Sequence, residues 1–392
     1  MTKRSHLDDL RAASRLAVEA TRGVIGLVEA MHRTIASGPA LLGKPLEKPA
    51  TALTGLVYGH IKNVTDVVGA GIDGALGLLA PLLGDSVPGP ERELVLAALN
   101  GVLGDYLAES KNPLAISFSL RRAGQDLALS KEALLAAIPE ASGRILVLVH
   151  GSCMNDLQWH RGGHDHGAAL ERELGFTAIY VRYNSGLHVS TNGRLLAAAL
   201  EELVSAWPVP VTELCLLGHS MGGLVARSAI HYGGPSLRGL LRRLVCIGTP
   251  HHGAPLERGG NWIDVLLGVS RYSAPLAQLG KIRSAGVTDL RFGNVIDEHW
   301  AGRDRFEPGP DQRVPVPLPE GVRCFAIAAS TTAELGPALA GDGLVPVDSA
   351  LGRHALGEHD LGFEARWIGL GMDHLALLDR AEVYQTLLGW LR

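Results

Sequence analysis

Cysteine is scarce in this sequence, with four among 392 residues: Cys153, Cys215, Cys246 and Cys324. All but Cys153 lie inside short apolar runs that are typical of buried strands. Cysteines in such runs behave as small apolar side chains, and their spacing matches neither a disulfide framework nor a Cys-x-x-Cys metal site. We therefore expect a protein of a reducing compartment, located in the cytoplasm, and we treat Cys153 as a packing residue.

Charge is also low, and neither sign dominates. Charged residues make up 19% of the chain, the formal net charge is −4, and the sequence pI is near 6.5. Because binding to phosphate backbones needs a basic surface, this balance argues against nucleic acid as the main partner. Hydrophobic residues make up 46%, which suits a chain that buries a large core.

Long apolar runs are missing as well. The longest, residues 67–84, is interrupted by Asp73 and Pro81, whereas a membrane-spanning helix needs about 20 predominantly apolar residues. Basic residues begin the chain, but His6 and Asp8 stand where the apolar core of a secretory signal would follow. The sequence therefore predicts neither a transmembrane helix nor a signal peptide.

The chain is expected to have two parts, a helical segment over residues 1–90 and a main domain over residues 91–392. Apolar residues recur at helical spacing over residues 7–35 and 51–68, and Pro88-Gly89-Pro90 forms a strong break after them. Two interpretations of these helices stay open. They dock on the main domain, or they form an amphipathic surface that meets a membrane, a lipid surface or a second subunit.

The main domain alternates strands with helices from about residue 113. Strands are expected at 115–120, 144–149, 176–181, 214–217, 241–247 and 322–328, and helices at 91–108, 195–207 and 221–232. This alternation predicts an α/β fold with a mostly parallel sheet and helices on both faces.

The strongest motif is Gly-His-Ser-Met-Gly at residues 218–222, between a buried strand and a helix. It matches the G-x-S-x-G nucleophile elbow, in which a strained turn exposes the serine at the start of a helix. Glycines are needed on both sides because a side chain there would collide with backbone. The helix beginning at Met221 directs its N–H groups toward Ser220, which makes this serine the candidate nucleophile.

A nucleophilic serine needs a base, and the base needs an orienting carboxylate, in the chain order Ser, Asp or Glu, His. Asp342 lies in a Gly-rich turn, and His374 follows the apolar run at 367–370, at the expected start of the final helix. Asp348 is the nearest rival of Asp342, which we favour because the glycine after it permits a sharp turn. His354 and His359 lie in a polar stretch with no preceding strand, so His374 is the predicted base.

A further element precedes the elbow, where the strand at 144–149 ends in the turn His150-Gly151. The backbone N–H of Ser152 after this turn would join the N–H of Met221 as an oxyanion hole.

Together these motifs resemble the bacterial esterase and lipase branch of the α/β hydrolases, including relatives of the GPI inositol-deacylase group. The resemblance covers roughly residues 112–392, and its motifs lie at 150–151, 218–223, 248–253, 341–346 and 373–375. It implies that Asp342 and His374 complete the triad of Ser220. Lipases often carry an apolar residue after the His-Gly turn, whereas Ser152 and Cys153 stand here, which disfavours a long-chain lipid substrate.

Residues 252–320 interrupt the alternation of strands and helices and are predicted to form a cap over the serine, because long insertions of this kind are often lids. The expected substrate pocket and cap residues are His150, Cys153, His219, His251 and Trp262.

Histidines also gather between Trp159 and His166, but their spacing fits no established metal site. We expect a solvated loop whose Asp165 caps the following helix, and we expect neither a metal nor a cofactor.

The predicted activity is therefore that of a serine hydrolase that cleaves a small-molecule or lipid ester through an acyl-enzyme. Three alternatives use the same triad: an acyltransferase, an amidase and a polyester depolymerase. A non-catalytic scaffold that binds membranes or partners is the last alternative, and it leaves the filled triad positions without a role.

Overall fold

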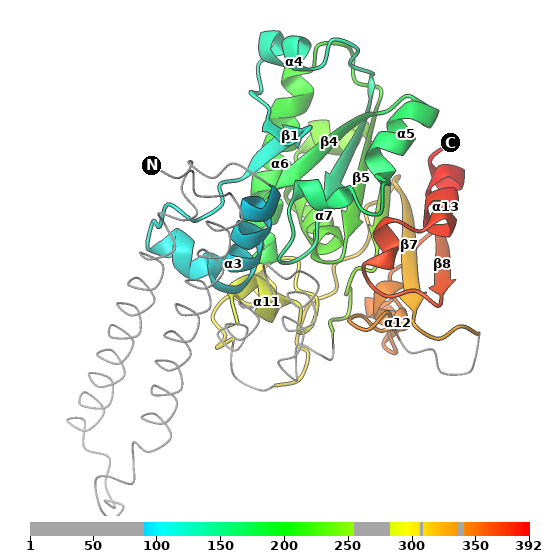
Figure 1. Cartoon of the computed structure of the whole chain (residues 1–392). Helices are drawn as coiled ribbons and strands as arrows, with labels where there is room; N and C mark the ends of the chain where they lie inside the picture. The colour runs from blue at the N-terminus through cyan, green and yellow to red at the C-terminus, as the bar shows by residue number, and fades with distance from the viewer. Residues whose placement is uncertain (1–89, 255–282, 306–308, 335–340) are drawn as a thin grey trace, which may run out of the picture. The chain divides into compact units, whose positions relative to one another are not determined.

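The computed structural model describes residues 90–254, 283–305, 309–334 and 341–392 (Figure 1). The chain divides into two compact units, and Leu96–Leu266 with Arg283–Arg392 form the larger one. The helices predicted before residue 90, Trp262 and much of the predicted cap lie outside the described residues. No helix in the described part of the chain is long and apolar enough to cross a bilayer.

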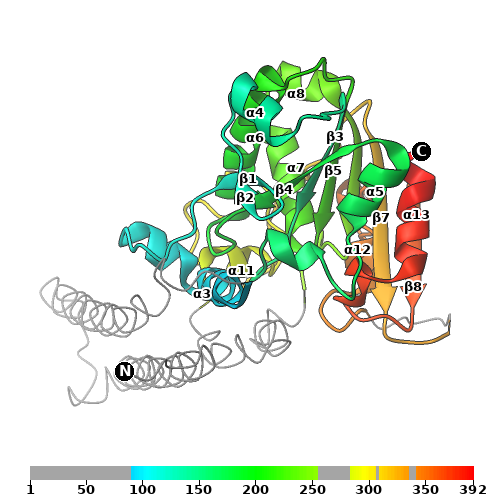
Figure 2. The same ribbon diagram turned by 45° about the horizontal axis from the view of Figure 1, so that its top comes forward.

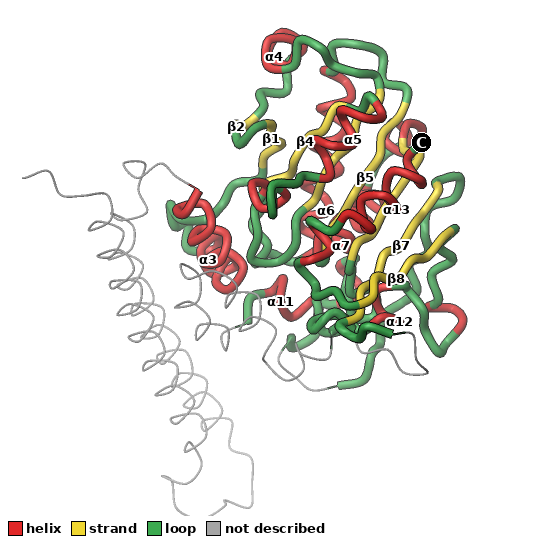
Figure 3. The backbone as a smooth tube through the Cα atoms, turned by 45° about the vertical axis from the view of Figure 1, so that its right-hand side comes forward, coloured by secondary structure: helices red, strands yellow, loops and turns green. Residues whose placement is uncertain are grey.

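A single sheet of eight strands forms the centre of the larger unit (Figure 3). Its spatial order is β2-β1-β4-β3-β5-β6-β7-β8. Strands β3 to β8 are parallel to one another, whereas β1 pairs antiparallel with β4 and with the edge strand β2. The strands are β1 (Ser119–Arg122), β2 (Gln125–Asp126), β3 (Arg144–Val149), β4 (Thr177–Arg182), β5 (Glu213–His219), β6 (Leu241–Ile247), β7 (Arg323–Ser330) and β8 (Ala365–Leu370).

Helices cover both faces of this sheet (Figure 2). Helices α5 (His166–Leu174) and α13 (Ala381–Leu391) pack on one face, and α6 (Val189–Ala206) and α7 (Met221–Tyr232) pack on the other. The central strands are buried along almost their whole length, as expected for a parallel sheet with two covered faces. This is the α/β-hydrolase architecture, and the predicted fold class is confirmed. Besides α3 and α11, which are described below, the other helical segments of the described residues are α4 (Lys131–Ala137), η2 (Asp156–Trp159), α8 (Pro235–Leu240), η4 (Asp297–His299), α12 (Val347–Ala350), η5 (Gly357–His359) and η6 (Ala376–Leu378).

The strand predicted at 115–120 is wrong over most of its length, because β1 begins only at Ser119. The buried side chain of Asn100 explains the difference. Its Nδ2 donates to the carbonyl of Leu114 at 2.8 Å, and its Oδ1 accepts from the N–H of Ile116 at 2.8 Å. These bonds take the backbone groups that a sheet partner would otherwise use.

Asn100 belongs to α3 (Pro90–Glu109), which confirms the helix predicted at 91–108. From Leu96 onward this helix lies in the larger unit, and glycines let it approach neighbouring loops closely. The amide of Asn184 donates to the carbonyl of Gly104 at 2.8 Å. A Cβ at Gly104 would lie 1.8 Å from the Asn184 Oδ1, so only glycine fits this contact.

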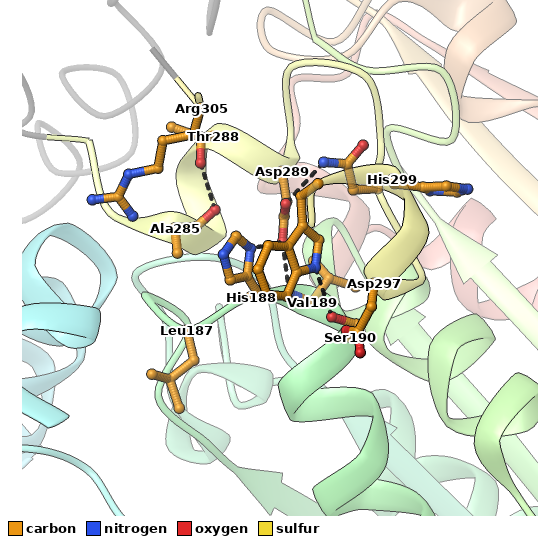
Figure 4. A network of polar contacts seen from close by, with 12 residues as sticks. Leu187, His188, Val189, Ser190, Ala285, Thr288, Asp289, Asp297, His299 and Arg305 are labelled. Atoms are coloured by element: carbon orange, nitrogen blue, oxygen red, sulfur yellow. Dashed lines mark hydrogen bonds and ion pairs between the residues drawn. The ribbon is translucent and has the colours of Figure 1, made fainter. Parts of the chain in front are cut away.

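After the undescribed part of the predicted cap, the chain returns through α11 (Ala285–Asp289), which is anchored by the buried carboxylate of Asp289 (Figure 4). One oxygen of Asp289 accepts from the N–H of Val189 at 2.8 Å and from His188 Nδ1 at 3.1 Å. The other accepts from Asn294 Nδ2 at 2.9 Å. The carboxylate therefore fixes this segment to the start of α6.

The interpretation of the histidine-rich segment as a solvated loop is wrong at both of its ends, because Trp159 and His166 are buried. The ring of His166 packs parallel to that of Tyr384, and its Nε2 lies 3.0 Å from the carbonyl of Leu377. The segment thereby joins α5 to the C-terminal helix. Asp165 caps α5 as predicted, since its side chain accepts from the N–H of Ala168 at 2.9 Å.

Candidate active site

The candidate site lies at the carboxyl ends of the parallel strands, the edge of an open α/β sheet where sites form. Ser220 directly follows β5, and His374 lies a few residues after β8. The turn that carries Asp342 is tied to the end of β7 through the bond from Thr331 N–H to the Gly341 carbonyl, at 3.1 Å. Three distant segments are therefore brought to one edge.

Ser220 has the strained backbone that a nucleophile elbow requires, with φ 54° and ψ −126° at the N-cap of α7. Its N–H donates to the carbonyl of Ile247 at 2.8 Å, which binds the turn to the end of β6. A Cβ at Gly222 would lie 2.1 Å from the Val149 carbonyl oxygen, and one at Gly218 would lie 2.5 Å from the Gly223 Cα. Both glycines are therefore required by the close packing around the serine.

Asp342 and His374 form a buried pair. The Nδ1 of His374 lies 2.7 Å from the Oδ2 of Asp342, and its backbone N–H donates to the Asp342 carbonyl at 3.0 Å. The other carboxylate oxygen accepts from the N–H groups of Leu344 and Val345, at 2.9 and 2.8 Å. Because an ionised carboxylate only accepts hydrogen bonds, this geometry places the imidazole proton on Nδ1 and leaves Nε2 as the basic nitrogen.

Ser220 and His374 both lie against the end of β6. The Ser220 N–H donates to the carbonyl of Ile247, and the next residue is Gly248. A Cβ at Gly248 would lie 3.2 Å from the His374 Cε1. The ring of His219, next to the serine in sequence, lies 4.7 Å from the His374 ring between centroids. The Ser220 Oγ is buried and has no hydrogen-bond partner among the described residues.

The structure places the rival residues away from this pair. The side chain of Asp348 is 74% exposed, and its Oδ1 lies 3.5 Å from the Nη1 of Arg353. The rings of His354 and His359 lie against each other with a centroid distance of 5.1 Å and a tilt of 55° between their planes. The expectation that His374 starts the final helix is wrong, because α13 begins at Ala381. Asp373 instead folds the intervening residues into a turn by accepting from two N–H groups, at 3.0 and 2.8 Å.

The turn after β3, predicted to hold the oxyanion, is built with a left-handed residue, since Cys153 has φ 58°. The N–H of Cys153 donates to the Ser185 Oγ at 3.0 Å. The hydroxyl of Tyr183 donates to the His150 carbonyl at 2.8 Å. These bonds fix the backbone on both sides of Ser152.

Three residues predicted for the pocket belong to this turn or precede the serine in the elbow, and all three are buried: His150, Cys153 and His219. His150 stacks on the ring of Tyr183 at 4.2 Å, and burial lowers the pKa of its imidazole to about 3. Burial also lowers the pKa of His219 well below its ordinary value, and the Nε2 of His219 lies 3.2 Å from the His374 carbonyl. Burial raises the pKa of the Cys153 thiol to about 12, so this cysteine is a weak nucleophile at neutral pH.

His251 lies elsewhere, inside the protein. Its Nδ1 is 3.2 Å from an Arg227 guanidinium nitrogen, and its ring centroid is 5.2 Å from that of Phe363. The expectation that His251 shapes the rim of the site is wrong, because its side chain is fully buried.

Tyr183 and Ser185, which hold the predicted oxyanion turn, were not predicted from the sequence. Both follow β4, and the one available signal was their place after a strand at the edge where sites form. Among the described residues, no group of three or more His, Cys, Asp or Glu side chains is arranged to hold a metal ion.

Comparison with known proteins gives one family match, to the model of the PGAP1-like alpha/beta domain over residues 140–310. No curated protein sequence matches the chain. Three similar solved structures are a mature lipase of Bacillus licheniformis, an esterase of Pyrococcus furiosus and lipase B of Aspergillus fumigatus.

The Bacillus lipase is 17% identical with a TM-score of 0.42, over 70% of this chain and 98% of that chain. The Pyrococcus esterase is 13% identical with a TM-score of 0.40, over 64% of this chain and 82% of that chain. The Aspergillus lipase is 12% identical with a TM-score of 0.39, over 63% of this chain and 52% of that chain. The sheet and its helices give the described part of this chain the fold of an α/β hydrolase, and over residues 140–310 it is similar to the PGAP1-like alpha/beta domain family.

Proposed function

We propose that this protein is a serine hydrolase that cleaves carboxylic esters through an acyl-enzyme on Ser220. The observation that supports the proposal is the buried pair of His374 and Asp342, whose Nδ1 and Oδ2 are 2.7 Å apart, together with the strained elbow at Ser220, both at the carboxyl edge of the sheet. An imidazole oriented in this way is a general base for a neighbouring hydroxyl.

The first half of the reaction begins when His374 Nε2 takes the proton of the Ser220 hydroxyl and Oγ attacks the ester carbonyl. The carbonyl π electrons move onto oxygen, and the N–H groups of Ser152 and Met221 bind the oxyanion. Met221 is the first residue of α7, where N–H groups lack intrahelical acceptors and the helix dipole favours negative charge.

The C–O bond to the alcohol then breaks, and His374 returns the proton to the leaving alkoxide. In the second half, His374 removes a proton from water, which attacks the acyl carbonyl and displaces the Ser220 Oγ. The serine recovers its proton from His374, and the carboxylic acid leaves. Asp342 stays ionised throughout and stabilises the imidazolium.

The test is hydrolysis of a series of p-nitrophenyl esters of increasing acyl length. We expect Ser220→Ala to lower kcat by about 10⁴-fold or more, because no other group supplies the nucleophile. The exposed Ser110 gives a matched control, since Ser110→Ala should leave kcat unchanged. Activity of Ser220→Ala equal to that of the wild type would show that another residue is the nucleophile.

A further inference from the structure

A cavity lies beside α7, lined by residues other than Ser220, Asp342 and His374. Its walls come from α7, from the loop after β6 and from the segments at 293–299, 313–318 and 358–362. Its volume is about 80 Å³, and a liquid water occupies about 30 Å³. A space of this size can admit a small ion or a few waters.

Arg227 lines this cavity from α7, seven residues after the serine, and only 6% of its surface is exposed. Its guanidinium donates to the Val316 carbonyl at 2.6 Å and to His251 Nδ1 at 3.2 Å. It has no carboxylate partner among the described residues, and its Nε has no hydrogen-bond partner there. A buried charge left in this state is costly unless an opposite charge accompanies it.

His251 adds a second unused donor to the same cavity. Arginine has donors only, so the Nδ1 of His251 must accept from Arg227, and the proton of the neutral ring is on Nε2. Burial keeps this ring neutral by lowering its pKa well below the ordinary value. The Nε2 is buried without a partner in the described part of the chain. Among the described residues, two buried N–H donors of side chains that line the cavity therefore lack acceptors.

The other charged groups around the cavity do not neutralise Arg227. Arg313 is paired with Asp311, at 2.8 Å between Nη2 and Oδ2. The Asp360 carboxylate is paired with Arg366 at 3.1 Å. Glu358 is 69% exposed at its side chain, so water screens its charge. Within the described part of the chain, the buried positive charge of Arg227 therefore has no compensating carboxylate.

We propose that this cavity is a binding site for a small oxyanion, a phosphate or a carboxylate group, held by Arg227 and His251. Guanidinium groups bind both anions through directed N–H donors, and a buried setting strengthens the contact. The bound anion would satisfy both unused donors and join α7 to the segment that carries Val316 and Arg313. This site is separate from ester cleavage, and its test does not depend on activity.

The test is thermal unfolding of the full chain in increasing inorganic phosphate, with sodium chloride keeping the ionic strength constant. We expect a saturable rise in Tm of roughly 3 °C for the wild type, because a ligand that binds the folded state stabilises it. Arg227→Met should abolish the rise. Arg323, which is exposed and paired with Glu364, gives a matched control, and Arg323→Met should keep it. Sodium acetate in place of phosphate shows whether a carboxylate serves as well.

An equal rise in Arg227→Met, or no rise with either anion, would overturn the proposal. Should Arg227→Met fail to fold, the dissociation constant of phosphate is measured by ³¹P NMR for the wild type and for Arg227→Lys. We expect Lys to weaken binding at least about tenfold, because an ammonium cannot reproduce the directed donors of the guanidinium. An unchanged constant in Arg227→Lys would equally contradict the site.

Discussion

Both oxygens of the Asp342 carboxylate accept hydrogen bonds, one from His374 and the other from two backbone N–H groups. The carboxylate therefore has one orientation, which in turn fixes the tautomer and the plane of the imidazole. The backbone bond from His374 to the carbonyl of the same aspartate, 3.0 Å long, adds a second constraint. On the proposed function, this pair aims Nε2 at the serine.

Asp342→Asn tests this account of the carboxylate. An amide in place of the carboxylate can donate to Nδ1, which favours the tautomer with its proton on Nε2, and we expect kcat to fall by on the order of 10⁴. The matched control is Asp348→Asn, which should keep kcat within about twofold because Asp348 is exposed. Steady-state hydrolysis of a p-nitrophenyl ester measures both. Equal losses in the two variants would refute the assignment.

The residues with assigned roles differ in how far the sequence could predict those roles. Ser220, Asp342 and His374 stand in motifs with a glycine or a strand beside them, so local pattern was enough to select them. Arg227 and Asp289 carry no such signal. Their roles come from contacts with residues far away in sequence, such as the bond between Asp289 and Val189, and sequence pattern does not record these contacts.

At the scale of elements, helix α3 supports the turn that is proposed to bind the oxyanion. A Cβ at Gly101 would lie 2.2 Å from the Cys153 Sγ and 2.9 Å from its Cα. The second distance matters more, because backbone cannot move aside as a flexible side chain can. The helix therefore sets the position of the left-handed residue next to Ser152.

Gly101→Ala should displace this turn. We expect kcat to fall by roughly 10²-fold, as when one oxyanion donor is lost, with a smaller change in KM. The matched control is Gly389→Ala on α13, where a Cβ meets no atom within 4 Å, and which should leave kcat unchanged. A change in KM alone would show that α3 shapes substrate binding instead.

The carboxylate of Asp289 is the corresponding anchor for the segment that follows the predicted cap. We expect Asp289→Ala to lower the free energy of unfolding by about 3 kcal/mol, because three donors lose their acceptor in the interior. Glu298 is exposed on the same segment, and Glu298→Ala should change the free energy by less than about 0.5 kcal/mol. Urea unfolding measures both, and indistinguishable midpoints would contradict the anchoring role.

Element boundaries were predictable where one backbone pattern dominates. Strands at 144–149 and 241–247 and the helix at 221–232 have the observed bounds, because apolar runs and glycines mark their ends. The segment at 115–120 alternates like a strand, yet Asn100 takes its backbone groups. A side-chain contact across the fold overrode a local pattern there.

At the scale of the whole molecule, several histidines are buried in neutral form. Burial lowers the pKa of His166 from 6.5 to about 4, and burial together with the nearby charge of Arg313 lowers that of His299 to about 4. The unfolded chain protonates these rings near their ordinary pKa, whereas the folded chain resists protonation. The contribution of these neutral rings to the free energy of unfolding is therefore fully present above pH 6.5. It is lost as the pH falls toward 4.

His166→Gln should make the protein less sensitive to acid. Between pH 7 and pH 5 the wild type should lose up to about 2 kcal/mol more of its free energy of unfolding than the variant, at about 1.4 kcal/mol per pH unit. The exposed His160 of the same segment gives the control, and His160→Gln should behave as the wild type. An identical loss in all three proteins would show that His166 does not contribute.

The alternation of strands and helices was enough to predict the parallel sheet with two covered faces, since each element buries its apolar side against the next layer. The antiparallel pair β1 and β2 at the sheet edge was not predictable, because both strands are short and largely uncovered. Trp262 was also predicted to line the substrate pocket, and it lies outside the described residues.

The central claim is that Ser220 is an activated nucleophile, and labelling with a fluorophosphonate tests it most directly. The full-length protein is treated with the probe, digested, and mapped by mass spectrometry, with Ser220→Ala and Asp342→Asn in parallel. We predict one modified peptide containing Ser220, no label in Ser220→Ala, and much slower labelling in Asp342→Asn. A folded wild-type protein that takes no label at Ser220, or takes it on another serine, would contradict the account.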